Sequence, residues 1–224
     1  MPGRSTIDRT LTLTSLCKTR RESHKPLFAV YVDLKAAFDS VDRQVLWQLL
    51  LALGLPRKVG RMIEVLYTNT ESCVRVASNT SDRIQVRSGV RQGCVLTSDS
   101  CNVARDWVLE RSTSIAMHGV SVGDENFSDL DYADEVALLT ELMEQLQSTL
   151  EVFAAEAALI GLVVNWKKTK IQSLREFLPP IGDLDIGGEQ VETVTSFTYL
   201  GTTTQRLETS EGQTTLNMGL HGRE

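Results

Sequence analysis

The sequence predicts an α+β fold in which helices cover one face of a mainly antiparallel sheet. Residues 26–34, PLFAVYVDL, form a near-continuous apolar run of strand length, which is typical of a strand buried on both faces. Residues 141–160 have the apolar period of an amphipathic helix, with apolar positions that include Leu142, Leu146, Leu150 and Phe153. Strand-like and helix-like segments interleave along the rest of the chain, which indicates a layered fold.

The remaining elements follow from capping, turn and apolar residues. Ser40 or Asp42 can cap a helix that ends at Gly54, and Pro56 is placed to open a second helix. The second helix has Val59, Met62, Ile63 and Leu66 on its apolar face. We then expect a hairpin around residues 79–82, a helix over about 98–116, a hairpin that turns at residues 134–135, and several short strands after residue 161.

Charge is distributed unevenly along the chain. The net charge of −6 argues weakly against a general nucleic-acid binder. However, residues 1–111 contain 17 Lys and Arg against 11 Asp and Glu, whereas residues 112–224 contain 6 against 18. The first half could therefore face a phosphate backbone, unless the asymmetry is due to chance.

Cysteine, histidine and apolar patterns narrow the protein class. The four cysteines form no CxxC pair and the three histidines are scattered, which disfavours a zinc site or a disulfide framework. We therefore expect an intracellular protein of the nucleus or cytoplasm. No apolar run of about 18 residues is present, so we expect no membrane span.

Acidic residues stand at the ends of two apolar strands. Asp33 ends the strand at 26–34, and Asp134 and Glu135 occupy the predicted hairpin turn. If these strands are neighbours, three carboxylates converge at one edge of the sheet. Mg²⁺ prefers such oxygen ligands, and two ions about 4 Å apart can stabilise both oxygens of a phosphoryl transfer. The alternative is that Asp33 caps the next segment and the acid pair is solvated.

Five segments in a fixed order resemble the motifs of a reverse transcriptase. They are AVYVDLKAAFDSVDR, GVRQGCVLTS, LDYADE, GLVVNWKKTK and FTYLG, and the resemblance spans about residues 3–204. The pattern looks like a non-LTR, LINE-type retrotransposon. The resemblance implies an RNA-directed DNA polymerase, a nucleotidyltransferase with palm, fingers and thumb. It also implies an RNA template, a DNA primer, dNTP and two Mg²⁺ ions, with Mn²⁺ as an alternative.

The resemblance implies roles for the residues around the first and third motifs. Asp33, Asp134 and Glu135 match the catalytic, metal-binding acids. The backbone of Leu34 would lie against the triphosphate. Phe38 matches the bulky side chain that crowds a ribose 2′-hydroxyl, although a core phenylalanine is equally consistent with its neighbours.

Further matches concern the nucleotide and the primer. Gln92 and Gly93 match the loop along the nascent base pair, and Lys168 matches a lysine that could protonate the leaving pyrophosphate. Without the resemblance, these residues read as plain loop and solvated lysine. Three residues resemble the hairpin that grips the primer terminus, although their aromatic side chains also fit a packed strand: Phe197, Tyr199 and Gly201.

The resemblance also implies domain boundaries. Residues 1–27 correspond to the end of the fingers, and residues 28–204 to the palm with a helical fingers insertion at about 42–88. Residues 205–224 form a weakly structured tail. Fingers strands that should precede residue 1 and most of the thumb are missing, so we expect a truncated, partly degenerate copy.

Two departures from the family pattern raise the alternative of a catalytically inactive remnant with at most weak nucleic-acid binding. Position 135 is Glu where the motif has Asp, and the extra methylene could displace the carboxylate by about 1 Å and impair the metal site. Ser98, Ser100 and Cys101 replace a proline and two apolar residues. Loss of the apolar pair could cost about 2–5 kcal/mol if the site is buried.

Overall fold

The computed structural model describes residues 5–91, 93–132, 135–174 and 182–205. The chain divides into two compact units. The first unit comprises Met1–Leu34, Val108–Glu156 and Val164–Glu224, and the second comprises Lys35–Trp107 and Ala157–Val163.

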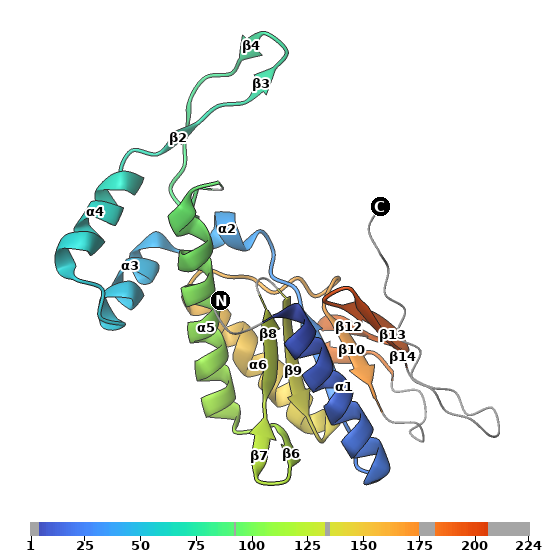
Figure 1. Cartoon of the computed structure of the whole chain (residues 1–224). Coiled ribbons are helices and arrows are strands. Elements are labelled where there is room, and N and C mark those ends of the chain that lie inside the picture. The colour runs from blue at the N-terminus through green and yellow to red at the C-terminus, as the bar shows by residue number, and fades with distance from the viewer. Residues whose placement is uncertain (1–4, 92, 133–134, 175–181, 206–224) are drawn as a thin grey trace. The chain divides into compact units, whose positions relative to one another are not determined.

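A six-stranded sheet with the order β11-β12-β10-β1-β9-β8 forms the centre of the first unit (Figure 1). All neighbouring strands are antiparallel except β10 and β12, which are parallel. The predicted α+β class with a mainly antiparallel sheet is therefore confirmed. The strands are β1 (Phe28–Val32), β8 (Asp129–Tyr132), β9 (Glu135–Thr140), β10 (Lys170–Ser173), β11 (Leu184–Ile186) and β12 (Glu189–Val194).

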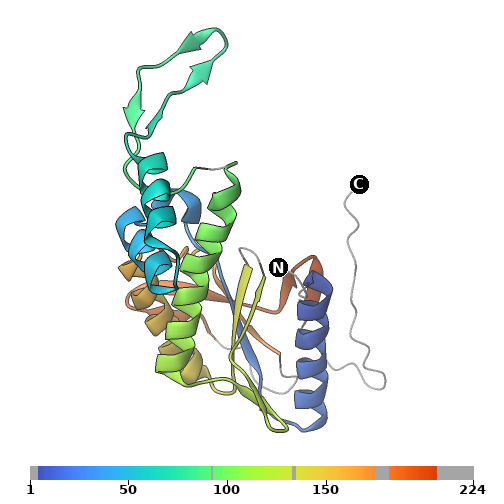
Figure 2. The same cartoon turned by 60° about the vertical axis from the view of Figure 1, so that its left-hand side comes forward.

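Helices lie on both faces of this sheet, not on one face as the sequence predicts (Figure 2). The helix α1 (Thr6–Glu22) contributes Leu13 and Leu16 to a buried cluster on one face. The first-unit part of α6 (Met143–Leu159) lies on the other face and buries Leu146 and Leu150 completely. The reason is that all five residues of β1 are buried, so apolar side chains emerge from both faces and each needs a cover.

Two hairpins complete the first unit. The strands β6 (Val120–Val122) and β7 (Glu125–Phe127) pair beside α1, and β13 (Ser196–Tyr199) pairs with β14 (Thr202–Gln205). Phe197 and Tyr199 of the second hairpin belong to the same apolar cluster as Leu13. The α1 face is therefore covered by a helix together with a hairpin.

The buried guanidinium of Arg20 fixes the end of α1. Its side chain is 3% exposed, donates to the carbonyl oxygens of Pro26 and Ser121, and pairs with Glu141 at 2.9 Å. The Glu141 carboxyl is partly desolvated, which opposes ionisation, but the hydrogen bond from Arg20 lowers its pKa below the ordinary value.

The second unit consists of short helices and a long hairpin. Its elements are α2 (Ala37–Ser40), α3 (Arg43–Ala52), α4 (Arg57–Tyr67), the pair β2 (Glu71–Ser72) and β5 (Ile84–Gln85), and the pair β3 (Arg75–Val76) and β4 (Asn79–Thr80). The helix α3 is capped by the side chain of Asp42, which settles the choice between Ser40 and Asp42. The helix α5 (Val95–Ala116) begins in this unit and ends in the first.

Two details of the second unit differ from expectation. The helix α4 buries Gly60, Ile63 and Tyr67, because the Tyr67 ring packs 5.2 Å from the ring of Trp47. Three residues of the predicted apolar face are exposed instead: Val59, Met62 and Leu66. The hairpin turns between Val76 and Asn79, where Ala77 has a φ of 53°, and the predicted turn residues 79–80 form β4 instead. In the described part of the chain, no helix is long and apolar enough to cross a membrane.

Replacing Arg20 by Met should lower the free energy of unfolding by about 2–4 kcal/mol, because two carbonyl groups and Glu141 lose a buried partner. Urea denaturation of the full chain measures this. The control is Lys18→Met on the exposed side of the same helix, which should cost less than about 0.5 kcal/mol. Equal losses in the two variants would contradict the structural role of Arg20.

Candidate active site

The register of the sheet brings Asp33 and Glu135 to the same edge. In the antiparallel pair β1 and β9, Val32 lies opposite Val136. Asp33 follows Val32 and Glu135 precedes Val136, so the two acids extend from adjacent strand ends. The two strands are therefore neighbours, which is the condition under which the sequence predicts that the acids converge.

A loop from the other side of β1 brings Lys168 to Asp33. The Asp33 carbonyl accepts a hydrogen bond of 2.7 Å from the Asn165 N–H, and Leu34 forms a bridge with Val164. Lys168 Nζ then lies 4.0 Å from Asp33 Oδ1, with the two side chains 70% and 40% exposed. An ion pair this exposed contributes little to the stability of the fold. Because both side chains are exposed, both groups are accessible to a ligand.

The acid pair is divided between described and undescribed residues. The strands β8 and β9 form the expected antiparallel hairpin, with Tyr132 opposite Glu135. Glu135 is the first residue of β9 and not part of a turn. Asp134, with Ala133, lies outside the described residues, as does Gln92.

The donors at this edge fit the ligand preference of Mg²⁺. The side chains of Asp33 and Glu135 offer only carboxylate oxygens. Asp33 is exposed enough to bind an ion that also binds substrate or water. Within residues 5–91, 93–132, 135–174 and 182–205, no three His, Cys, Asp or Glu residues are grouped closely enough to hold an ion. Any third acid from the predicted set is Asp134.

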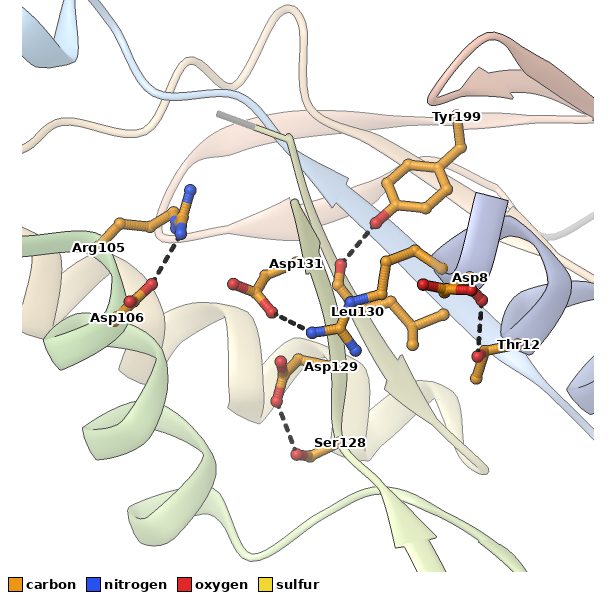
Figure 3. A network of polar contacts seen from close by, with 10 residues as sticks. Asp8, Thr12, Arg105, Asp106, Ser128, Asp129, Leu130, Asp131 and Tyr199 are labelled. Atoms are coloured by element: carbon orange, nitrogen blue, oxygen red, sulfur yellow. Dashed lines mark hydrogen bonds and ion pairs between the residues drawn. The ribbon is translucent and has the colours of Figure 1, made fainter. Parts of the chain in front are cut away.

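The hairpin of β13 and β14 packs on the face of the sheet that α1 also covers. The Phe197 ring stacks 4.0 Å from the ring of Tyr31, and the Tyr199 hydroxyl donates to the Leu130 carbonyl at 2.8 Å (Figure 3). Burial raises the pKa of Tyr199, and the charge of Glu135 raises it further. The two aromatic side chains thus support the hairpin from the sheet side, whereas Gly201, with a φ of 78°, lies exposed in its turn.

Sequence reasoning missed a buried ion pair beside the acid motif. Arg9 of α1 donates to Asp131 of β8 at 2.9 Å, and their side chains are only 19% and 10% exposed. Figure 3 shows Asp131 beside Asp129 and Leu130 on β8. The signal in the sequence was the acid at position 131, which directly follows Leu130 in a strand that pairs with the apolar segment 136–139, since a buried carboxylate needs a cationic or hydrogen-bonding partner.

In the second unit, the backbone at Phe38 lies against the loop that begins at Gly89. The Val90 N–H donates to the Phe38 carbonyl at 2.6 Å. A Cβ at Gly89 would lie 2.5 Å from the backbone of Phe38 and Asp39, and the φ of Gly89 is 70°. Gly93 also has a positive φ, but the space around it is open. Phe38 is half-buried.

A comparison with protein families decides the identity of this fold. Residues 1–204 match the model of the reverse transcriptase (RNA-dependent DNA polymerase) family. The chain belongs to the reverse transcriptase family. The predicted resemblance is therefore confirmed, and it covers the segments that contain Asp33, Glu135 and Lys168.

Relatives among curated proteins come from mobile elements, which agrees with the resemblance to a non-LTR, LINE-type retrotransposon. The chain is 29% identical to the Pol polyprotein of retrotransposable element R2 from Popillia japonica over 73% of its length, and 29% identical to that from Nasonia vitripennis over 74%. A transposon TX1 protein of Xenopus laevis is 28% identical over 80% of the chain. The chain spans only 14–23% of the length of these three relatives.

Solved structures of telomerase share the fold. The telomerase of Candida tropicalis, in complex with a fragment of telomeric RNA, superimposes with a TM-score of 0.65 at 15% identity, over 95% of this chain and 32% of that one. The corresponding complex from Candida albicans gives a TM-score of 0.60 at 14% identity, over 91% and 33%. At these identities the likeness concerns the polymerase fold alone.

Replacing Gly89 by Ala should destabilise the protein more than Gly54→Ala, as measured by thermal unfolding. Both glycines have a positive φ, which costs an alanine about 1–2 kcal/mol, but only Gly89 faces backbone atoms at 2.5 Å. We expect Gly89→Ala to lower Tm by at least twice as much as Gly54→Ala. Equal shifts would mean that the close approach of the loop to Phe38 is not required.

Proposed function

We propose that this chain carries the nucleotidyl-transfer site of an RNA-directed DNA polymerase, which joins a dNTP to a primer 3′-hydroxyl with two divalent ions. One observation supports this most strongly. In a member of the reverse transcriptase family, the register of β1 and β9 brings Asp33 and Glu135 to one sheet edge, and Lys168 lies 4.0 Å from Asp33.

The acids and Lys168 would have different roles in nucleotidyl transfer. Asp33 and Asp134 hold the ions and Glu135 assists, since a carboxylate edge without cations would be repulsive. Divalent ions, which this family generally uses, stabilise the attacking and leaving oxygens; Mg²⁺ suits the oxygen donors, and Mn²⁺ is the alternative. Lys168 is exposed enough to reach the leaving pyrophosphate and give it a proton.

Nucleotide and primer would contact residues outside the acid edge. We assign the triphosphate to the backbone of Leu34, the sugar to Phe38, and the nascent base pair to Gln92 and Gly93. The positive φ of Gly93 and the open space around it support a close approach of this backbone to a ligand. The hairpin with Phe197, Tyr199 and Gly201 is assigned to the primer terminus.

The macromolecular partners are an RNA template and a DNA primer. Family membership supports this assignment, as do telomerase structures of the same fold that contain a telomeric RNA fragment. We assign residues 1–27 to the end of the fingers, 28–204 to the palm with a fingers insertion at about 42–88, and 205–224 to a tail. The function places the protein inside the cell, in the nucleus or cytoplasm.

Primer extension on a poly(rA) template with an oligo(dT) primer tests the proposal, with Mg²⁺ or Mn²⁺ and the full 224-residue chain. Asp33→Ala and Asp134→Ala should each lower the rate by at least about 100-fold, because an ion loses a ligand that stabilises the transition state. The matched control is Asp124→Ala at an exposed position of the β6–β7 turn, which should extend at the normal rate.

Two outcomes would contradict the catalytic assignment. Unchanged extension by either acid variant would remove that residue from the site. No extension by the unmutated chain, together with salt-dependent RNA binding, would favour the alternative of an inactive domain that still binds nucleic acid.

Phe38→Ala should relax the choice between deoxyribonucleotides and ribonucleotides. Removing the ring makes room for a 2′-hydroxyl, so relative incorporation of UTP over dTTP should rise by about 10–100-fold, while dTTP incorporation changes less. Single-nucleotide incorporation assays measure both, and circular dichroism checks that the half-buried position tolerates the change. An unchanged UTP to dTTP ratio would assign Phe38 to packing alone.

A further inference from the structure

Glu135 makes a contact that its position in the acid motif does not explain. Its Oε2 accepts a hydrogen bond of 2.8 Å from the backbone N–H of Leu200. Leu200 lies 65 residues further along the chain, in the loop that joins β13 to β14. The acid-bearing hairpin of β8 and β9 is thus tied to the hairpin of β13 and β14.

The geometry of the β13–β14 loop explains why this N–H is not used by the strand ladder. Tyr199 pairs with Thr202, so Leu200 and Gly201 form a two-residue loop, and their φ values are 49° and 78°. Positive φ at both positions is the pattern of a type I′ hairpin turn. The N–H of the first loop residue takes no part in the strand ladder, so it is available to the Glu135 carboxylate, which binds it at an exposed position.

A second hydrogen bond acts in parallel. The Tyr199 hydroxyl donates to the Leu130 carbonyl at 2.8 Å, and Leu130 lies opposite Ala137 in the β8–β9 pair (Figure 3). Tyr199 is only 1% exposed. Consecutive residues of one hairpin thus contact both strands of the other, and this restricts sliding and rotation between them.

The length of the Glu side chain decides whether the contact to Leu200 forms. An aspartate at 135 would lack one methylene, which shortens its reach by about 1 Å. The N···O distance, which is 2.8 Å with Glu135, would then increase beyond the range of a hydrogen bond unless the hairpin moved. A carboxylate has about four lone-pair sites, so one bond to Leu200 leaves capacity for a cation.

We propose that Glu135 is a positioning residue, whose side-chain length holds the β13–β14 turn in a fixed place beside the acid-bearing hairpin. The contact itself is independent of catalysis. Its consequence, that the primer terminus is aligned with the acids, rests on the proposed polymerase function.

Residue-resolved hydrogen exchange of the Leu200 amide in the full chain tests the contact without any activity. Glu135→Asp should accelerate exchange by about tenfold or more, because a charge-assisted hydrogen bond is lost. Glu135→Gln keeps the length and an acceptor oxygen, so it should accelerate exchange by less than about threefold. Glu192→Asp, at an exposed position of β12, is the matched control and should leave Leu200 unchanged.

Two results would overturn the proposal. One is a Leu200 amide that exchanges equally fast in the unmutated chain and in Glu135→Asp. The other is equal acceleration by Glu135→Asp and Glu135→Gln, since charge and not reach would then be decisive.

The primer-extension assay adds a readout that separates the two proposals. If the chain extends primers, Glu135→Asp should raise the KM for primer–template more than it lowers kcat, and Glu135→Gln should show the smaller rise in KM. A larger effect on kcat alone would contradict primer alignment by Glu135. Absence of extension in every form would refute the proposed function and leave the exchange result to decide the contact.

Discussion

The pairing of β1 on both sides is the constraint on which the first unit depends. Its five residues are all buried, and it lies between β9 and β10 in the sheet. Because hydrophobic burial and two ladders of backbone hydrogen bonds fix this strand, its end is a fixed point for whatever follows. Asp33 occupies that point, β9 brings Glu135 to it, and the loop before β10 brings Lys168. The side chains that could do chemistry are therefore positioned by apolar residues that do none.

Burial of β1 on both faces has a second consequence, which reaches the β13–β14 hairpin. Tyr31 emerges on the α1 face, where its ring stacks on Phe197 and its hydroxyl donates to Gln172 at 3.0 Å. Gln172 in turn binds Thr204, and burial raises the pKa of Tyr31, which keeps the hydroxyl neutral and able to donate. A hairpin that holds a primer would need a stable base, and these contacts supply one from the same sheet that presents Asp33.

Local sequence patterns predicted the elements that have a clear apolar period. They did not predict an element with a weak apolar period, or a contact between residues far apart in the sequence. The strand at β1, the helix α6 and the β8–β9 hairpin follow from apolar periodicity, and the order of five motifs was sufficient to recognise the family. The helix α1 was missed although Ser5 and Asp8 form a capping box, because its polar composition masks the stripe of Leu13 and Leu16. The contact from Glu135 to Leu200 leaves no local trace, since it joins a side chain to a backbone group 65 residues away.

The altered segment at residues 98–101 contains one buried polar substitution, Ser100, whose hydroxyl has a partner in its own helix. Ser100 stands where the family has an apolar residue, and it is buried, with 6% of its surface exposed. A buried hydroxyl destabilises chiefly when it lacks a partner. Ser100 donates to the Leu96 carbonyl at 2.7 Å, one turn earlier in α5, and the buried Thr97 hydroxyl donates to the Arg91 carbonyl. The helix therefore satisfies the buried hydroxyl of Ser100, and at this position the cost of lost apolar contact falls on packing alone. The loop that precedes α5 approaches the backbone of Phe38 closely in the presence of these residues.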